Sequence, residues 1–239
     1  ANNIGMIYTV KDKKDTALKY FEKAKNIFKE IGDKQNLPRA LMNIGILNEK
    51  KLNFSKAIIS YEKAIEISIK TDNKITQAMA KSNLGNIYFY TGKYSDAEEM
   101  YKTSLNLLDD LGYKLGTGAL KINLGNVYKA KKEYPLAMKF YNSAFEIVKE
   151  INAKTYLIQC LFNKAELYFF LGKYQEARKL NSEVLALMEE VKDTGAKFSA
   201  KLLDILLMAE EDKPESVKKL QELALRYRTN PENTGEINY

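Results

Sequence analysis

The chain has 239 residues, of which 45% are hydrophobic and 29% charged, a balance typical of a globular fold rather than a disordered chain. It contains no His and a single Cys, Cys160, so zinc clusters, Ser-His-Asp triads, Cys-His dyads and a disulfide framework are all excluded. The net charge of +7 comes almost entirely from Lys interleaved with Glu and Asp, whereas nucleic-acid surfaces cluster their charge and favour Arg. We therefore expect neither nucleic acid nor membrane as a partner, and no run of apolar residues reaches the length of a membrane span.

A period of forty residues organises the chain. Asn3-Ile4-Gly5 recurs as Asn43-Ile44-Gly45, Asn83-Leu84-Gly85 and Asn123-Leu124-Gly125, and then weakens to Asn163-Lys164-Ala165. The residue three positions after each Gly is Tyr, except at Asn48. A second register carries Ala without exception and, four residues further on, Phe or Tyr with a single exception at Asn181. Its residues are Ala17, Ala57, Ala97, Ala137 and Ala177, followed by Phe21, Tyr61, Tyr101 and Tyr141.

The period predicts six units and a tail, taken in chain order. They are 1–33 (truncated at its start), 34–73, 74–113, 114–153, 154–193, a degenerate capping helix pair at 194–229, and a tail at 230–239. Within the third unit, apolar residues at a 3.6-residue spacing predict helices over 74–91 and 94–111. Glycine in the short connections, as at Gly92 and Gly172, supplies the left-handed backbone that ends a helix.

The small residues of the two registers have a packing role. A Gly on the first helix of a pair, and an Ala on the second, allow the two helices to approach closely, and the large aromatic side chains fill the remaining space. One pair cannot bury its apolar face alone, so neighbouring pairs are expected to stack.

The motif of Leu84-Gly85, Tyr88, Gly92-Lys93-Tyr94, Ala97 and Tyr101 resembles the tetratricopeptide repeat family. The unit is longer than that family's usual repeat and lacks the Pro that ends the second helix. It is similar to the extended subtype of kinesin light chains, Pins-type adaptors and the Rap/PlcR regulators. The resemblance covers residues 1 to about 190. It implies an all-α, right-handed superhelical array of antiparallel helix pairs.

The two ends of the chain depart from the repeat. Residues 196–210 and 215–228 have the length of a sixth helix pair, with Val217 in the Ala register and Arg226 onward expected to fray. At the other end, Ala1 falls inside a first helix, and we expect further chain or another domain before it. Self-association through the repeat ends is a further expectation.

The recurring Asn is the strongest candidate for a binding function. A side-chain amide both donates and accepts hydrogen bonds, so Asn43, Asn83, Asn123 and Asn163 could hold the backbone of an extended peptide. The resemblance adds that first helices line the concave face of the array, and that Asn at this position contacts ligand backbone in the extended subtype. The alternative is that these residues cap carbonyls or hold adjacent helices in register.

Selectivity for ligand side chains is expected from residues one turn along the first helices. The candidates are Asn86, Asn126, Lys50, Phe89, Tyr90 and Lys129. For the aromatic members, and for Phe169 and Phe170, packing between repeats is an equally good interpretation.

These features predict a non-enzymatic scaffold that binds a protein or peptide, with no cofactor, no metal and no catalytic residue. The positive charge favours an acidic ligand. The alternative function is the regulatory or sensor module of a larger signalling protein, such as a kinase, a cyclase or a transcriptional regulator. We expect a cytoplasmic protein; the sequence lacks an initiator Met and cannot be read for a signal peptide.

Two further segments have simpler interpretations. The glycine-rich stretch 112–118 lacks the Gly-Lys-Ser/Thr ending of a phosphate loop, so we expect a turn between repeats. Cys160 lies in an apolar segment and is expected to be a small buried side chain.

Overall fold

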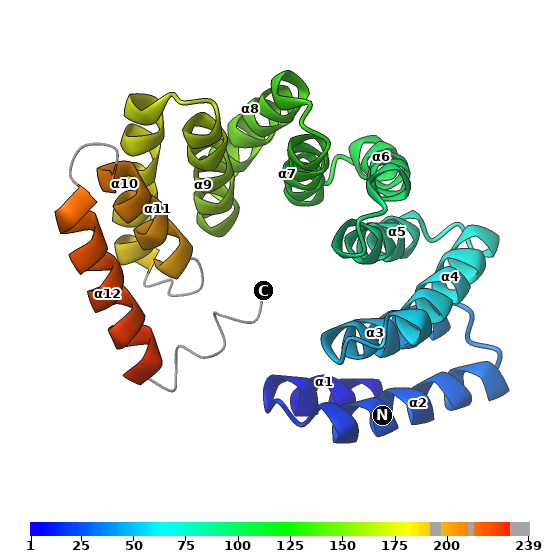
Figure 1. Ribbon diagram of the computed structural model, residues 1–239. Coiled ribbons are helices and arrows are strands. Elements are labelled where there is room, and N and C mark those ends of the chain that lie inside the picture. Colours follow the sequence, from blue (N-terminus) through cyan, green and yellow to red (C-terminus); the bar gives the residue numbers. More distant parts are fainter. Residues whose placement is uncertain (192–196, 210–212, 230–239) are drawn as a thin grey trace. The chain divides into compact units, whose positions relative to one another are not determined.

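A computed structural model describes residues 1–191, 197–209 and 213–229 of the chain (Figure 1). The described residues form twelve helices and no strand, which confirms the all-α prediction. The predicted tail at 230–239 lies outside them. In chain order the helices are α1 (Asn2–Val10), α2 (Lys14–Glu30), α3 (Leu37–Lys50), α4 (Phe54–Lys70), α5 (Lys74–Tyr90), α6 (Tyr94–Asp110), α7 (Lys114–Ala130), α8 (Tyr134–Glu150), α9 (Lys154–Phe170), α10 (Tyr174–Val191), α11 (Lys197–Ala209) and α12 (Lys213–Thr229).

The chain divides into two compact units, residues 1–127 and 128–239, and the boundary falls near the end of α7. In the first unit, successive helices from α1 to α6 pack against one another, and α3 also contacts α5 directly. In the second unit, α8 packs on α9, α9 on α10, α10 on α11 and α11 on α12, while α11 also reaches α9. Each unit is therefore a series of helices in which neighbours along the chain are neighbours in space, as stacking of helix pairs predicts.

Close approach of paired helices has the predicted cause. All five residues of the Ala register have 0% exposed surface. A Cβ added at Gly45 would lie 2.4 Å from Cε1 of Tyr61, and one added at Gly85 would lie 2.7 Å from Cε1 of Tyr101. Each aromatic ring of the second helix thus lies directly on the backbone of a glycine in the first, where any larger residue would displace it.

The turns between helices follow a regular pattern of backbone conformation. A residue with positive φ occurs in each connection from α1 to α10, at intervals of twenty residues. Four of these are glycines, and the others are Asp12, Leu52, Asp72, Lys132 and Asn152. Asp and Asn tolerate positive φ better than other non-glycine residues, so Leu52 and Lys132 adopt this backbone conformation without such a preference. The connections have one geometry, although only some carry the glycine that marks a helix end in the sequence.

The predicted helices of the third unit agree with α5 and α6 to within one residue. The turn predicted over 112–118 is shorter than expected, because only residues 112–113 of this stretch lie between helices and residues 114–118 begin α7. Cys160 is buried, as expected. The assignment of Val217 to the Ala register was wrong, because this side chain is 54% exposed while Ser216 is buried. The last helix pair has lost the repeat register, so counting forty residues from Ala177 misses the buried face by one position.

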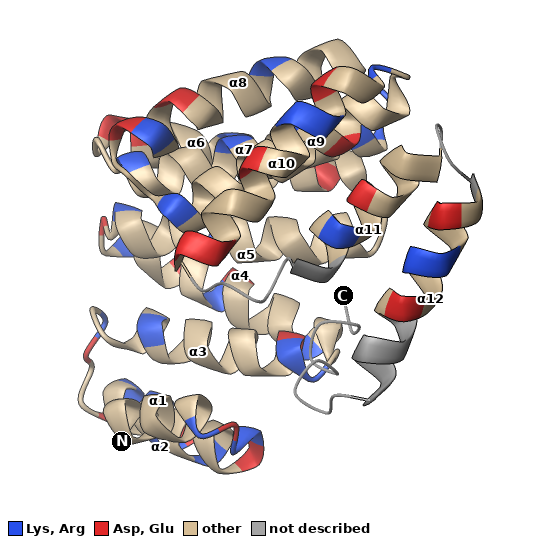
Figure 2. Ribbon diagram, turned by 90° about the vertical axis from the view of Figure 1, so that its left-hand side faces the viewer, with Lys and Arg blue, Asp and Glu red and all other residues tan. Residues whose placement is uncertain are grey.

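Figure 2 shows that Lys and Arg occur together with Asp and Glu on many of the helices. Several pairs lie within ion-pair distance, including Lys51 with Asp15 at 2.6 Å and Lys102 with Glu98 at 2.6 Å. Such exposed pairs contribute about 0–1 kcal/mol each. The charges mainly keep the helix surfaces hydrated.

Candidate functional site

The predicted Asn residues occupy the same register on the first helix of each pair. Asn43 on α3, Asn83 on α5 and Asn123 on α7 belong to the first unit, and each is half-buried. Asn163 on α9 belongs to the second unit and is only 8% exposed. The register places each Asn two positions before the small residue that faces the second helix, so the amide projects from another flank of the same helix.

Two of these amides make hydrogen bonds between first helices. Nδ2 of Asn43 donates to Oδ1 of Asn2 at 3.1 Å, and Nδ2 of Asn123 donates to Oδ1 of Asn86 at 3.5 Å. Asn83 makes no side-chain hydrogen bond within the part of the chain that the structure describes. The two bonds agree with a role in helix register. Each uses only the NH2 group, so the carbonyl oxygens of Asn43 and Asn123 keep acceptor capacity for another group.

The buried tyrosines reach this side of the first helices. The Tyr101 hydroxyl donates to Oδ1 of Asn86 at 2.7 Å, and the Tyr61 hydroxyl donates to Oε2 of Glu49 at 2.7 Å. Each tyrosine ring comes from the second helix and passes over the glycine of the first helix. Its hydroxyl therefore reaches a polar residue on the opposite flank of the first helix. Asn86 accepts from two donors and is therefore held in one orientation, which periodicity alone did not indicate.

Burial perturbs the ionisation of these groups. It raises the pKa of Glu49, and the hydrogen bond from Tyr61 lowers it by less. Burial also raises the pKa of the Tyr61 hydroxyl, as does the neighbouring Glu49 carboxylate. The two groups form a hydrogen-bonded pair in which the phenol donates its proton to the carboxylate.

The aromatic candidates divide into two kinds. The Phe89 ring lies 5.6 Å from that of Tyr94 on the paired helix, and Phe169 lies at the same distance from Tyr174. These two side chains take part in packing within their pairs. Tyr90 and Phe170 come next in sequence, and they are 63% and 59% exposed. An exposed ring at the end of a first helix is available to a ligand, but that role remains a prediction.

The remaining candidates, Lys50, Asn126 and Lys129, differ in their exposure and in their ion pairs. Lys50 is exposed at the end of α3, and Asn126 is half-buried on α7. Lys129 forms an ion pair with Glu166 of α9, and both belong to the second unit. Lys129 is therefore committed to a neighbouring first helix, and a ligand carboxylate would have to compete with Glu166 for it.

Asn163 has an unusual environment. Its Nδ2 is buried and has no hydrogen-bond partner among the described residues. A buried amide donor without an acceptor costs about 1–3 kcal/mol. Two residues further on, the position that is Gly in the earlier repeats is occupied by Ala165, which is fully buried. Asn163 thus retains the register of the other Asn residues, with a donor left to satisfy.

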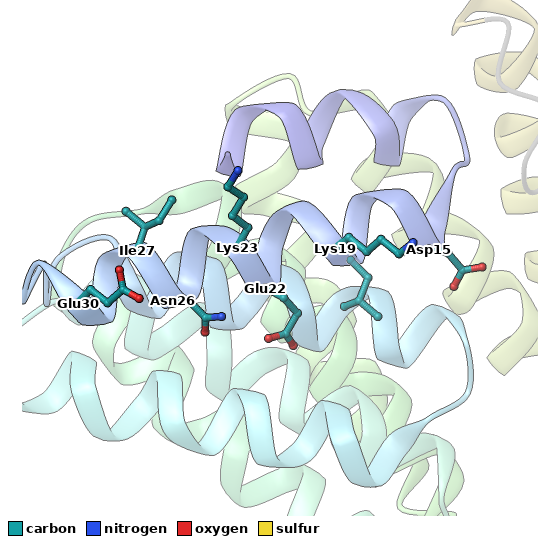
Figure 3. A pocket seen from close by; sticks show the side chains of 8 residues that line it. Asp15, Lys19, Glu22, Lys23, Asn26, Ile27 and Glu30 are labelled. Carbon is teal, nitrogen blue, oxygen red and sulfur yellow. The ribbon is translucent and has the colours of Figure 1, made fainter.

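Two hollows on the described part of the surface lie away from these residues. One of 850 Å³ follows the outer face of α2, and Figure 3 shows that every labelled side chain around it belongs to this helix. Another of 670 Å³ lies between α2, α3 and α4. Neither is lined by a predicted site residue. Sequence reasoning missed the second, although the exception at Asn48, which lines it, was a signal.

The described residues include no group of three or more His, Cys, Asp or Glu placed to hold a metal ion. Among the helices of the described ranges, none combines the length and apolar character needed to cross a membrane.

Comparisons with known proteins point to one family. The profile described as "Tetratricopeptide repeat" matches residues 1–70, 53–110, 76–150 and 116–190. No curated protein matches the chain.

Among solved structures, aspartyl phosphate phosphatase F from Bacillus subtilis has 17% identity and a TM-score of 0.82 over 95% of this chain and 59% of its own. The Rap conjugation gene regulator of plasmid pLS20, in complex with the Phr* peptide, has 19% identity and a TM-score of 0.74 over 95% and 61%. A kinesin light chain of Podosopora anserina has 14% identity and a TM-score of 0.64 over 81% and 95%. These proteins share the fold of this chain, and the chain spans about three fifths of the first two.

Proposed function

Because the chain belongs to the tetratricopeptide repeat family, we propose that it is a non-enzymatic scaffold that binds an extended peptide segment of a partner protein. The observation that carries the proposal is the placement of Asn43, Asn83 and Asn123 at one register of successive first helices, each half-buried. Asn163 repeats this arrangement on α9 of the second unit, which is considered by itself.

The geometry of an extended chain suits this register. Helices α3 and α5 are in direct contact. Packed helices lie about 8–10 Å apart, and an extended peptide rises about 3.3 Å per residue. One amide would therefore meet about every third residue of the peptide. Since backbone N–H and C=O groups recur at every residue, the amides would hold a segment with little regard to its side chains.

Selectivity would then come from neighbouring side chains. Tyr90 offers an exposed ring, Lys50 an exposed ammonium, and Asn86 an oriented amide. The excess of Lys over acidic residues favours an acidic segment. A peptide complex of the Rap regulator, which shares this fold, supports the choice of a peptide as ligand.

The test uses a displayed library of random peptides selected on the wild-type protein. The affinity of selected peptides is then measured for the Asn83→Ala/Asn123→Ala variant and for a control variant, Asn106→Ala/Gln175→Ala, at exposed uncharged positions of the second helices α6 and α10. Two lost hydrogen bonds of about 1 kcal/mol each predict about thirtyfold weaker binding to the first variant only.

A second comparison tests whether the backbone is what the amides hold. Replacing single peptide amides by esters should weaken binding to wild type and have little effect on the Asn83→Ala/Asn123→Ala variant. Equal binding by both proteins would show instead that the Asn residues serve helix register.

A second candidate function is the sensor module of a larger signalling protein, with a kinase, cyclase or transcriptional regulator as the effector. Coverage of only 59% and 61% of the phosphatase and the Rap regulator favours it. Determining the complete reading frame tests this candidate, which requires an effector domain in the same protein.

A further inference from the structure

A hollow on the first unit lies apart from the Asn residues. It has a volume of 670 Å³ and is bounded by α2, α3 and α4, and we call it the α2–α4 groove. Its lining from α3 includes Leu41, Ile44 and Asn48. At about 100° per residue, these three side chains point roughly 100–160° away from Asn43 around the same helix. The groove is therefore a different surface from the proposed peptide site.

The sequence explains why the groove occurs between these helices. The position of Asn48 is Tyr in the other repeats, and the position twelve residues later carries a large side chain in each. Tyr8 stacks on Tyr20 with ring centroids 5.4 Å apart, and Tyr128 stacks on Phe140 at 5.2 Å. The corresponding pairs elsewhere are Tyr88 with Met100 and Tyr168 with Leu180, whereas here they are Asn48 with Ser60. Two bulky side chains are replaced together by small ones, and both replacements line the groove.

The small polar side chains do not make the groove polar. Nδ2 of Asn48 donates to the Ile44 carbonyl at 2.9 Å, and the Ser60 hydroxyl donates to the Lys56 carbonyl at 2.9 Å. Both donors are used by their own helices. The floor that remains is apolar, with Leu41 and Ile44 beneath and Ile59 on one wall, where it is 51% exposed. An exposed Ile beside an apolar floor is suited to cover a side chain inserted from outside.

The rim of the groove is positive. Four lysines and two glutamates line it, which leaves a net charge of +2: Lys25, Lys29, Lys56, Lys63, Glu22 and Glu66. Both glutamates already have a partner, since Glu22 pairs with Lys25 and Glu66 with Lys70. Lys29 and Lys56 are exposed and form no ion pair within the described residues. These two ammonium groups, one on each wall, are free to meet carboxylates.

We propose that the α2–α4 groove is a second docking surface, and that it binds an acidic peptide segment that inserts a large apolar side chain between α2 and α4. The inserted side chain takes the space that Tyr and a large residue occupy in the other repeats. Carboxylates flanking it on the segment meet Lys29 and Lys56. The volume lies within the range of about 300–1,000 Å³ found for ligand pockets.

The experiment uses the intact 239-residue chain and two displayed peptide libraries. One has Glu at alternate positions and random residues between them, and the matched library has Lys in place of Glu. Selected peptides are synthesised, and their affinities are measured by fluorescence anisotropy for the wild type and three variants. Asn48→Tyr/Ser60→Met fills the groove with the pair found at Tyr88 and Met100, Lys29→Glu/Lys56→Glu reverses the rim charge, and Asn83→Ala/Asn123→Ala alters only the proposed peptide site.

The expected result is a set of binders from the Glu library that share a large apolar residue. Their affinity should fall about tenfold or more in the filled and the charge-reversed variants, and stay unchanged in Asn83→Ala/Asn123→Ala. Filling should not impair folding, because it restores a pair present in the other repeats. If it does, the charge-reversed variant decides the outcome, since its substitutions are exposed.

Three results would overturn the proposal. They are the absence of binders from the Glu library, a preference for the Lys library, and binders that neither groove variant weakens. Binders that are lost only with Asn83→Ala/Asn123→Ala would also count against it, and would support the proposed function instead. The two proposals therefore fail separately.

Discussion

Helices α3 and α4 of the first unit and helices α9 and α10 of the second pack by different means. In the first pair, the Tyr61 ring lies on Gly45 and its hydroxyl binds Glu49 of the same pair. In the second pair, the corresponding residues are Ala165 and Asn181, both fully buried. Nδ2 of Asn181 donates to the Ala200 carbonyl of α11, at 2.9 Å.

The comparison shows that the small residue and its partner change together. A ring needs the space above a glycine, whereas the shorter Asn leaves room for the methyl group of Ala165. The shorter side chain also directs its amide toward the next helix instead of back to its own pair. In the α3–α4 pair this residue forms its hydrogen bond within the pair, whereas in the α9–α10 pair it forms its hydrogen bond to the helix that follows.

The largest expected effect comes from exchanging the small residues. Gly45→Ala places a methyl group against a buried ring that Glu49 holds in place, and overpacking of this kind costs about 1–3 kcal/mol. Removing glycine from a helix returns up to about 1 kcal/mol, so the net result is destabilisation. Ala165→Gly should also destabilise, by about 1 kcal/mol, because Gly is a poorer helix former than Ala and the buried methyl group is lost from the core. Urea unfolding followed by helical circular dichroism measures both.

A double variant sharpens this comparison. Gly45→Ala/Tyr61→Asn reproduces the second pair in the first unit, and it should be more stable than the sum of the two single effects predicts. Additive effects, or a Gly45→Ala protein as stable as wild type, would mean that ring and glycine are not coupled.

An intermediate effect is expected at the other pair. Asn181→Leu keeps the volume but leaves the buried Ala200 carbonyl without its donor, at a cost of about 1–3 kcal/mol. Part of this free-energy cost is offset, because the substitution also removes Oδ1 of Asn181, a buried oxygen without a hydrogen-bond partner among the described residues. Hydrogen exchange should therefore accelerate in α11 and much less in α9. Unchanged protection of α11 would show that this hydrogen bond does not hold the last pair in place.

The smallest effect concerns pH and belongs to the first pair alone. Burial raises the pKa of Glu49 in the folded state, so its contribution to stability is fully present below the unfolded value of 4.5 and is lost as pH rises through the folded pKa. Glu49→Gln keeps an acceptor for Tyr61 and should remove this part of the pH dependence. The check is urea unfolding of both proteins from pH 4 upward, in steps of about half a unit. Parallel stability curves would exclude Glu49 as the titrating group.

The sequence allowed much of the fold to be predicted, for a physical reason. The positions of Gly45, Ala57 and Tyr61 carry Gly, Ala and an aromatic residue in each of the first three repeats. A contact between pair-mates is set by residues at such a constant spacing. The register failed at Val217 because the last pair no longer carries the motif, so counting had no anchor there. The Asn residues were located correctly on the first helices, but their hydrogen bonds to Asn2 and Asn86 come from neighbouring repeats and have no counterpart in a spacing rule.

By itself, the sequence determined the helix pairs, their order and the close contact at each glycine, since all of these arise between residues a fixed distance apart in the chain. Only the tertiary structure decided where Tyr61, Asn86 and Asn181 place their polar atoms, and that Asn48 and Ser60 open one groove between α2 and α4. Those outcomes depend on side chains that helices bring together in space. The residues at these positions differ from repeat to repeat, so the forty-residue period does not predict their contacts.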